Sequence, residues 1–258
     1  IDIGGWFLSD SNDNLFKYEI ANGTTIGPNG YLVLYQDLNF GNANDPGSYE
    51  QFALSENGER LYLSSAHDGV LTGYRSTEDF GASETGVSFG RYFKSSTGNY
   101  NFVAMEENTP GSANSYPKVG PIVISEIMYN PDWPDGDSYT NDQYEYIELH
   151  NISAEPVALF RYDKSDPWKF TDGIDFTFPA DVPVTIGAGG YLLVVKKPAA
   201  FSWRYPAVPE EIILGPYDGS LSNAGESLEL SMPGDVDKDN QRQYIRIDRV
   251  NYSDGSHP

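Results

Sequence analysis

The chain has 258 residues, a formal net charge of −22 and no cysteine. Its excess of carboxylates repels nucleic-acid phosphates, which proteins bind through Lys and Arg, so no nucleic-acid partner is expected. The lack of thiols removes disulfides, thiolate catalysis and zinc–sulfur sites. Hydrophobic residues make up 39% of the chain, enough to form cores. No stretch approaches the roughly 20 apolar residues of a membrane helix, so no membrane insertion is expected.

Alternating apolar residues predict short strands along the whole chain, each ended by Gly, Pro, Asn or Asp. The segments lie at residues 31–35, 60–63, 122–124, 144–149, 191–195 and 227–230. Three dipeptides favour tight turns because both of their residue types accept positive φ: Asn22-Gly23, Asn29-Gly30 and Asn57-Gly58. Residues 198–205 are the best candidate for a helix. The predicted fold class is all-β.

Two blocks of sequence occur twice in the same order, which predicts two copies of one module. The first block is TIGPNGYL at residues 25–32 and TIGAGGYL at residues 185–192, an offset of 160 residues. The second is SENGERLYL at residues 55–63 and SNAGESLEL at residues 222–230, an offset of 167 residues. A short insertion between the blocks accounts for the difference in offset.

A Pro- and Gly-rich stretch between the copies, residues 109–121, has the composition of a linker. We therefore predict two domains, residues 1–118 and residues 119–258. The absence of a leader-like segment at the start is typical of a mature or excised fragment.

The two copies differ in which segments they contain. The second has residues 122–130 and 145–151 before its Thr-Ile-Gly block, whereas residue 1 of the first copy already aligns near residues 154–157. The first copy continues through residues 86–105, which have no counterpart before the end of the second. Either flanking sequence accounts for this, or strands arrive from another chain at exposed sheet edges.

The second copy resembles a bacterial lamin-tail domain over residues 122–252. The motifs that carry the resemblance are ISEIMYNP at residues 124–131, EYIELHN at 145–151, DGIDFTFP at 172–179, the strand at 187–195, GPYDGSLSNAGE at 215–226 and DRVNY at 248–252. The first copy matches less completely, through GGWFLSD at residues 4–10, SFGR at 88–91 and TPGSAN at 109–114. The resemblance implies two tandem immunoglobulin-like β-sandwich domains, the first N-terminally and the second C-terminally incomplete.

Bacterial members of this family are accessory modules of large secreted or surface proteins, so the resemblance implies an extracellular or cell-surface location. Nuclear relatives bind DNA and proteins, and the net charge of −22 argues against carrying the DNA part over. Within residues 145–149, alternation places Glu145, Ile147 and Leu149 on one face. Since that face is apolar elsewhere, we expect one Glu near a strand end or accepting from backbone donors.

Two acidic segments are candidate calcium sites. Asp235, Asp237 and Asp239 have the alternate spacing that lets carboxylates converge on one hard cation. The alternative is an acidic hairpin turn between strands at residues 228–231 and 244–250. Asp135 and Asp137 lie with further aspartates in the loop at residues 132–142, where the alternative is a solvated loop. Calcium is the one cofactor that the sequence suggests.

Loop-proximal aromatic residues suggest a carbohydrate site, with Trp133 and Tyr139 as candidate ligand-binding residues. Trp168 and Trp203 are expected to pack inside the fold. Gly86-Val87-Ser88-Phe89-Gly90 fits the nucleophile-elbow pattern, but a strand-like segment follows it where the elbow needs a helix. We therefore expect no catalytic residue.

The leading hypothesis is a non-catalytic structural or adhesive segment of a secreted or cell-surface protein. It would space other domains or contact protein partners, including copies of itself through exposed strand edges in an extracellular filament or sheath. The alternative is a carbohydrate-binding accessory module, supported by calcium, with a polysaccharide as partner.

Overall fold

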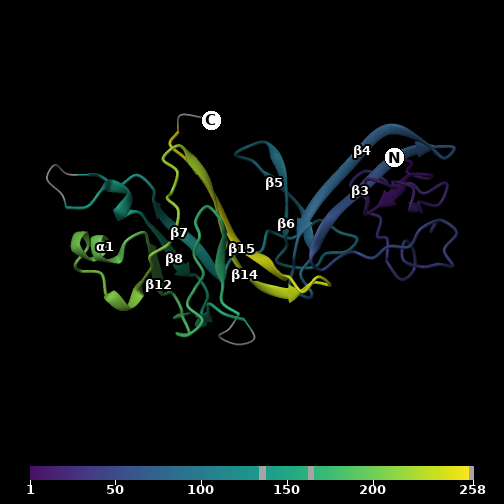
Figure 1. Cartoon of the computed structure of the whole chain (residues 1–258). Helices are drawn as coiled ribbons and strands as arrows, with labels where there is room; N and C mark the ends of the chain where they lie inside the picture. Colours follow the sequence, from purple (N-terminus) through teal and green to yellow (C-terminus); the bar gives the residue numbers. More distant parts are fainter. Residues whose placement is uncertain (134–137, 162–165, 256–258) are drawn as a thin grey trace. The chain divides into compact units, whose positions relative to one another are not determined.

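The computed structural model describes residues 1–133, 138–161 and 166–255. The chain divides into two compact units, residues 1–118 (unit 1) and residues 119–258 (unit 2). Strands dominate both units, and α1 (Pro198–Arg204) is the one α-helix among the described residues (Figure 1). The chain is thus mostly β, with several antiparallel sheets. In the described ranges, no helix has the length and apolar character needed to cross a membrane.

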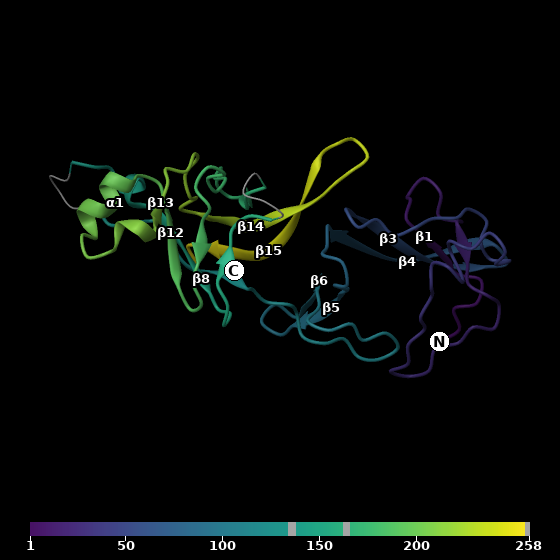
Figure 2. The same ribbon diagram turned by 90° about the horizontal axis from the view of Figure 1, so that it is seen from below.

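Unit 1 contains two antiparallel sheets. Its strands are β1 (Phe7–Ser9), β2 (Tyr18–Glu19), β3 (Gly58–His67), β4 (Val70–Gly81), β5 (Phe89–Lys94) and β6 (Asn99–Ala104). The first sheet has the order β2-β1-β3-β4, and β5 pairs with β6 alone. Figure 2 shows β1 beside β3 and the long β3–β4 hairpin. This hairpin turns at Asp68 and Gly69, with φ of 49° and 73°, as a two-residue turn requires.

The core of unit 1 depends on residues outside its strands. Phe40 and Phe52 are buried in connecting segments, and their rings stack with centroids 4.7 Å apart. They pack with Ile3, Tyr18 and Ile20 in one buried cluster. Connecting segments therefore supply part of the core of this unit, alongside Leu8, Leu61 and Leu63 from its strands.

Unit 2 contains a four-stranded sheet, a three-stranded sheet and a short two-stranded pair. Its elements are β7 (Ile122–Met128), the 3₁₀ helix η1 (Asn141–Tyr144), β8 (Tyr146–Asn151), β9 (Val157–Ala158), β10 (Lys169–Asp172), β11 (Thr185–Ile186), β12 (Tyr191–Val195), α1, the 3₁₀ helix η2 (Glu210–Ile212), β13 (Ile213–Leu214), β14 (Gly225–Val236) and β15 (Arg242–Ser253). The sheet orders are β13-β12-β8-β7, β10-β14-β15 and β11-β9. All pairs are antiparallel except β12 with β13.

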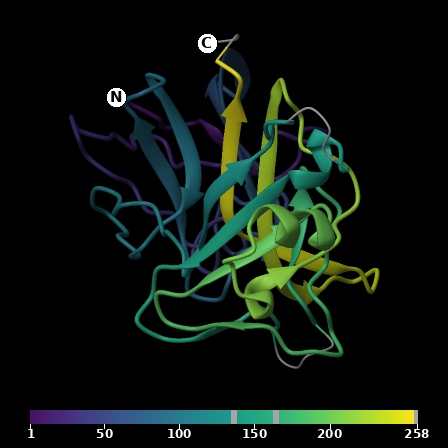
Figure 3. The ribbon, with the colours of Figure 1, turned by 90° about the vertical axis from the view of Figure 1, so that its left-hand side faces the viewer.

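Helix α1 packs against the four-stranded sheet of unit 2 (Figure 3). Pro198 occupies its first turn, where a missing N–H costs nothing. Phe201 is buried against Tyr146, Leu193 and Val195 from β8 and β12. The predicted helix at residues 198–205 is confirmed. Through Phe201, helix α1 covers part of one face of this sheet.

The predicted strands are confirmed, with one exception. Residues 191–195 form β12, and the other segments lie within β3, β7, β8 and β14, although β8 begins at Tyr146 after η1. The strand predicted at residues 31–35 is wrong: this segment has no sheet partner in the structure. Its alternating apolar pattern suits a strand, but a strand forms only where a neighbour accepts its backbone hydrogen bonds.

Candidate functional site

The two copies of the second sequence block form the same turn. In unit 1 the Ser55 N–H donates to Glu59 Oε1 at 2.6 Å, just before β3. In unit 2 the Ser222 N–H donates to Glu226 Oε1 at 2.8 Å, just before β14. The Glu in each copy therefore caps the turn that starts the long hairpin.

The glycine of this turn is equivalent in the two copies as well. Gly58 and Gly225 have φ of 88° and 102°, a region that favours glycine. Each donates its N–H to the Ser carbonyl three residues earlier, at 3.1 and 3.2 Å. The repeat seen in the sequence is thus also a repeat of local backbone structure.

The first sequence block also forms one turn in both copies. Gly30 N–H donates to Gly27 O at 3.0 Å, and Gly190 N–H donates to Gly187 O at 2.9 Å. In unit 2 this turn leads directly into β12. Residues 31–35, which we call the open segment, follow the same turn in unit 1 and are therefore the counterpart of β12.

Strand β12 and its counterpart, the open segment, have different neighbours. In unit 2, β12 lies between β8 and β13 and pairs with both. In unit 1, the peptide N–H groups of residues 31–34 donate to no described residue. The next one, that of Tyr35, donates to Asn39 Oδ1 at 2.9 Å. The open segment therefore presents unpaired donors and acceptors, as an edge strand does.

Side-chain exposure follows the same division. Leu192 of β12 is 5% exposed, whereas Leu32 of the open segment is 41% exposed. Leu221, before β14, is 3% exposed, whereas Leu54, its counterpart before β3, is 46% exposed. The equivalent positions are apolar in both copies, but only unit 2 covers them.

Leu54 lines an apolar pocket of about 550 Å³ in unit 1. Leu61 and Leu63 line it as well, together with Phe80 and Phe89. Leu34 of the open segment packs against the same buried cluster as Leu61 and Leu63 of this pocket. The counterparts of Leu54, Leu61 and Leu63 in unit 2 are 0–3% exposed. The pocket is therefore a part of the core that remains uncovered in unit 1.

In unit 2, the strands β7 and β8 contribute fully buried side chains. Ile122 of β7 and Ile147 and Leu149 of β8 are fully buried. The Ile124 N–H donates to the Asp248 carboxylate at 2.7 Å, which joins β7 to β15 of the other sheet. The sequence repeat contains no counterpart of these two strands in unit 1, and the structure contains none among residues 1–118.

Glu145, the residue directly before β8, links this strand to the segment at residues 217–221. Its carboxylate accepts the Leu221 N–H at 3.0 Å and the Tyr217 hydroxyl at 2.7 Å, and the side chain is buried. Burial raises the pKa of Glu145, while these two hydrogen bonds lower it to a smaller extent. The expected Glu at the strand end that accepts a backbone donor is confirmed.

Asn151 anchors the other end of β8. Its side-chain amide lies near three carbonyl oxygens, those of Glu155, Ile186 and Gly187, at 2.8–3.0 Å. Its own N–H donates to Gly190 O at 2.9 Å. Sequence reasoning assigned Asn151 no role. The signal was available in the strict alternation Glu145, Ile147, Leu149, Asn151.

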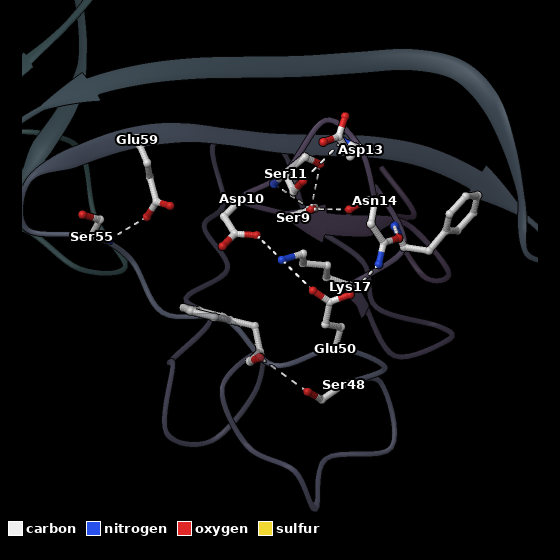
Figure 4. Close-up of polar contacts among 12 residues, drawn as sticks. Ser9, Asp10, Ser11, Asp13, Asn14, Lys17, Ser48, Glu50, Ser55 and Glu59 are labelled. Atoms are coloured by element: carbon white, nitrogen blue, oxygen red, sulfur yellow. Dashed lines mark hydrogen bonds and ion pairs between the residues drawn. The ribbon is translucent and has the colours of Figure 1, made fainter. Parts of the chain in front are cut away.

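A charged cluster in unit 1 is accounted for by local structure (Figure 4). Lys17 Nζ lies 2.9 Å from both Asp10 Oδ1 and Glu50 Oε1. Hydrogen bonding to Glu50 and then to Asp10 raises the pKa of Lys17. Ser9 Oγ donates to the Asn14 carbonyl at 2.6 Å. These contacts tie residues 9–17 to residue 50, so the cluster holds a loop in place.

The acidic tip of the β14–β15 hairpin is also self-contained. Asp237 Oδ1 accepts the N–H groups of Asp239 and Gln241, and Oδ2 accepts the side chain of Gln243. The pKa of Asp237 is lowered chiefly by the Gln241 N–H. The hairpin alternative for Asp235, Asp237 and Asp239 therefore describes the segment.

The calcium prediction gains no support from the parts of the chain that the structure describes. No three Asp, Glu or His side chains there are arranged to hold a metal ion. Asp135 and Asp137 lie outside the described residues. Calcium binding stays a prediction from spacing.

The candidate carbohydrate residues lie in unit 2. Trp133 is 60% exposed, and Tyr139 lies with its ring centroid 6.3 Å from that of Trp203. Trp203 was expected to pack inside, yet it is also 60% exposed on α1. Trp168, in contrast, is buried as expected. The structure thus adds Trp203 to the exposed aromatic residues.

Ser88 does not lie in a nucleophile elbow. It directly precedes β5, so a strand follows it where the elbow has a helix. Its N–H donates to Asn108 Oδ1 at 3.1 Å, and its carbonyl accepts the Met105 N–H at 2.8 Å. Ser88 is therefore part of the hairpin that β5 and β6 form.

Comparisons with protein-family models, with curated proteins and with solved structures find no match for this chain. The most informative comparison is therefore internal, between unit 1 and unit 2. It identifies the open segment and its pocket as the candidate functional site.

Proposed function

We propose that the chain is a non-catalytic structural or adhesive segment of a secreted or cell-surface protein, built from two lamin-tail-like, immunoglobulin-like β-sandwich modules. It contacts other polypeptides by β-strand addition at the open face of unit 1, which consists of the open segment and its pocket. The observation that supports the proposal is the contrast between the exposed Leu32 and the buried Leu192 at equivalent positions. Contacts of this kind would space domains or join subunits in an extracellular filament or sheath.

Strand addition suits this face for two physical reasons. Unpaired N–H and C=O groups along an extended segment supply affinity through main-chain hydrogen bonds. An adjacent apolar pocket supplies specificity, since burying its surface contributes about 25 cal/mol per Å². A net charge of −22 keeps such an edge from indiscriminate association with other acidic chains.

Hydrogen exchange of the isolated chain tests this proposal. We expect the amides of residues 32–34 to exchange nearly as fast as those of a disordered peptide. The amides of residues 192–194 should exchange at least about a thousandfold more slowly, since they lie in the centre of a sheet. Equal protection of the two segments in dilute solution would refute an open face and with it the proposed contact site.

A second candidate function is carbohydrate binding in unit 2. It is favoured by two tryptophans, Trp133 and Trp203, that are each 60% exposed, with the Tyr139 ring beside the second. Tryptophan fluorescence titrations with polysaccharides test it. Trp133→Ala should abolish a genuine response, and Phe93→Ala, an exposed aromatic residue of unit 1, is the matched control. Binding that survives Trp133→Ala would refute this site.

A further inference from the structure

The hydrogen bonds between β8 and β12 in unit 2 show which backbone groups of the open segment correspond to groups that bind a neighbouring strand. Asn151 N–H donates to Gly190 O, and Lys196 N–H donates to Glu145 O, at the two ends of the ladder. Hydrogen-bonded pairs alternate in an antiparallel ladder. Residues 192 and 194 of β12 are therefore the ones whose amides face β8.

The equivalent backbone groups of unit 1 have no hydrogen-bond partner within residues 1–118. Residues 32 and 34 correspond to residues 192 and 194, and their N–H groups donate to no described residue. The Gly30 carbonyl, counterpart of Gly190 O, accepts no hydrogen bond from any residue that the structure describes. The Leu54 N–H, counterpart of the Leu221 N–H that Glu145 accepts, likewise has no acceptor within residues 1–118.

The side chain before β8 and three side chains within it form one alternating, buried series. Glu145, Ile147, Leu149 and Asn151 are 0–3% exposed. The two aliphatic residues are fully buried, and the leucines of unit 2 whose counterparts line the pocket of unit 1 are buried as well. Glu145 and Asn151 form hydrogen bonds with backbone groups at the two ends of this series. The buried residues at this place in unit 2 therefore follow the pattern Glu-x-aliphatic-x-aliphatic-x-Asn.

We propose that the open face of unit 1 binds a β-strand with this pattern, antiparallel to residues 31–35, supplied by a polypeptide segment outside residues 1–258. The inference rests on the proposed function and names the partner of that same site. The bound strand's Glu would accept the Leu54 N–H. Its Asn would donate to the carbonyls of Ile26 and Gly27, as Asn151 does to Ile186 and Gly187.

A second copy of this chain is the weaker occupant. Within the sequence the full pattern occurs at residues 145–151. That strand already occupies its place in unit 2, paired with β7 and β12. Within residues 1–258 a single strand of this pattern would have to serve both faces, so its binding to unit 1 of a second copy would leave unit 2 open.

The test uses the whole chain, isotopically labelled, and a synthetic peptide with the sequence of residues 144–153. At saturation the amides of residues 32, 34 and 54 should exchange at least tenfold more slowly. The amide of residue 33, which points away from the added strand, should change little. This alternation distinguishes strand addition from nonspecific coverage of the pocket.

Two pairs of peptides provide matched controls. N-methylation at Leu149, which lies in a hydrogen-bonded pair, should weaken binding roughly tenfold, whereas the same methyl group at Glu148 should have little effect. Replacing Asn151→Asp removes the donors that face two carbonyls and should weaken binding by more than tenfold. His150→Asp adds the same negative charge on the other face and should weaken it less.

The outcomes separate this inference from the proposed function. Fast exchange at residues 32–34 with no effect of the peptide would overturn the partner named here and leave an open face. Protection that increases with protein concentration, without peptide, would assign the site to a second copy and also overturn it. Protection in dilute chain alone would overturn both proposals.

Discussion

Unit 1 and unit 2 begin their long hairpins with the same turn and end one loop with the same glycine turn, yet the segments after the glycine turn differ. Residues 191–195 form the centre of a sheet, and residues 31–35 form no ladder at all. Both segments are apolar and free of charge. Local sequence thus sets the backbone path, while a strand also needs a neighbour.

The two units also form their cores in different ways. Unit 2 buries Ile147 and Leu149 of β8 completely. Unit 1 stacks Phe40 on Phe52, both in connecting segments, and leaves a pocket of about 550 Å³. Equivalent substitutions in the two units should therefore have unequal effects wherever coverage differs, and equal effects where the local structure is shared.

The largest expected inequality lies at Leu221 and Leu54. Leu221→Ala removes a buried side chain and should lower the free energy of unfolding of unit 2 by about 3 kcal/mol. Leu54→Ala removes a half-exposed one and should cost unit 1 less than about 1 kcal/mol. Native-state hydrogen exchange of the β14 and β3 amides reports on each unit separately. Losses of similar size would mean that unit 1 is covered in solution.

The next effect should be equal in the two units. Gly58→Ala and Gly225→Ala each place a Cβ against a carbonyl oxygen, that of Phe80 or Tyr252, in a backbone with positive φ. Each should cost about 2 kcal/mol, measured by the same amides. Gly27→Ala is the control, because open space surrounds it. A loss confined to one unit would break the equivalence of the two turns.

A pH-dependent effect should occur at Glu145. Burial raises its folded pKa above the unfolded value of 4.5, so the folded state holds this proton more tightly. The stabilisation is full below pH 4.5 and is lost as pH rises through the folded pKa. Glu145→Gln should flatten this decline, followed through the β14 amides. Glu59, whose pKa burial also raises, makes β3 unsuitable as a reference. An unchanged slope would contradict the buried role of Glu145.

The smallest expected effect is at Leu32. Leu32→Ser should change the stability of unit 1 by less than about 0.5 kcal/mol, because its side chain is largely in water already. Leu192→Ser, the matched change in β12, should cost unit 2 at least about 2 kcal/mol. Thermal melts of the two variants compare them directly. A large loss from Leu32→Ser would show that the open segment packs in solution.

Sequence reasoning predicted those elements whose information is local. The strand at residues 191–195, the helix beginning at Pro198 and the turn at Gly58 all follow from pattern and conformational preference. The role of Glu145 could be foreseen because a charged residue broke an apolar face. The turn at Asp68 and Gly69 was not singled out, although this dipeptide is typical of a two-residue hairpin.

The remaining features depend on contacts that a linear pattern does not contain. Residues 31–35 have the pattern of a strand, but no partner in unit 1 accepts their hydrogen bonds. The residue type of Trp203 favours packing inside, and its position on the outer side of α1 exposes it. Asp237 has calcium-like spacing, yet its carboxylate accepts hydrogen bonds from its own turn. Each depends on three-dimensional neighbours.

The open segment also affects the tendency of the isolated chain to aggregate in solution. Its five residues, YLVLY, are uncharged, rich in β-forming side chains and free of proline, the composition that stacks into cross-β fibrils. Pro28 and Asp37 flank it as gatekeepers, and colloidal repulsion between strongly acidic molecules keeps copies apart. Near the isoelectric point of about 4.2 that repulsion vanishes. The acidity of the surface thus opposes aggregation through this exposed apolar segment.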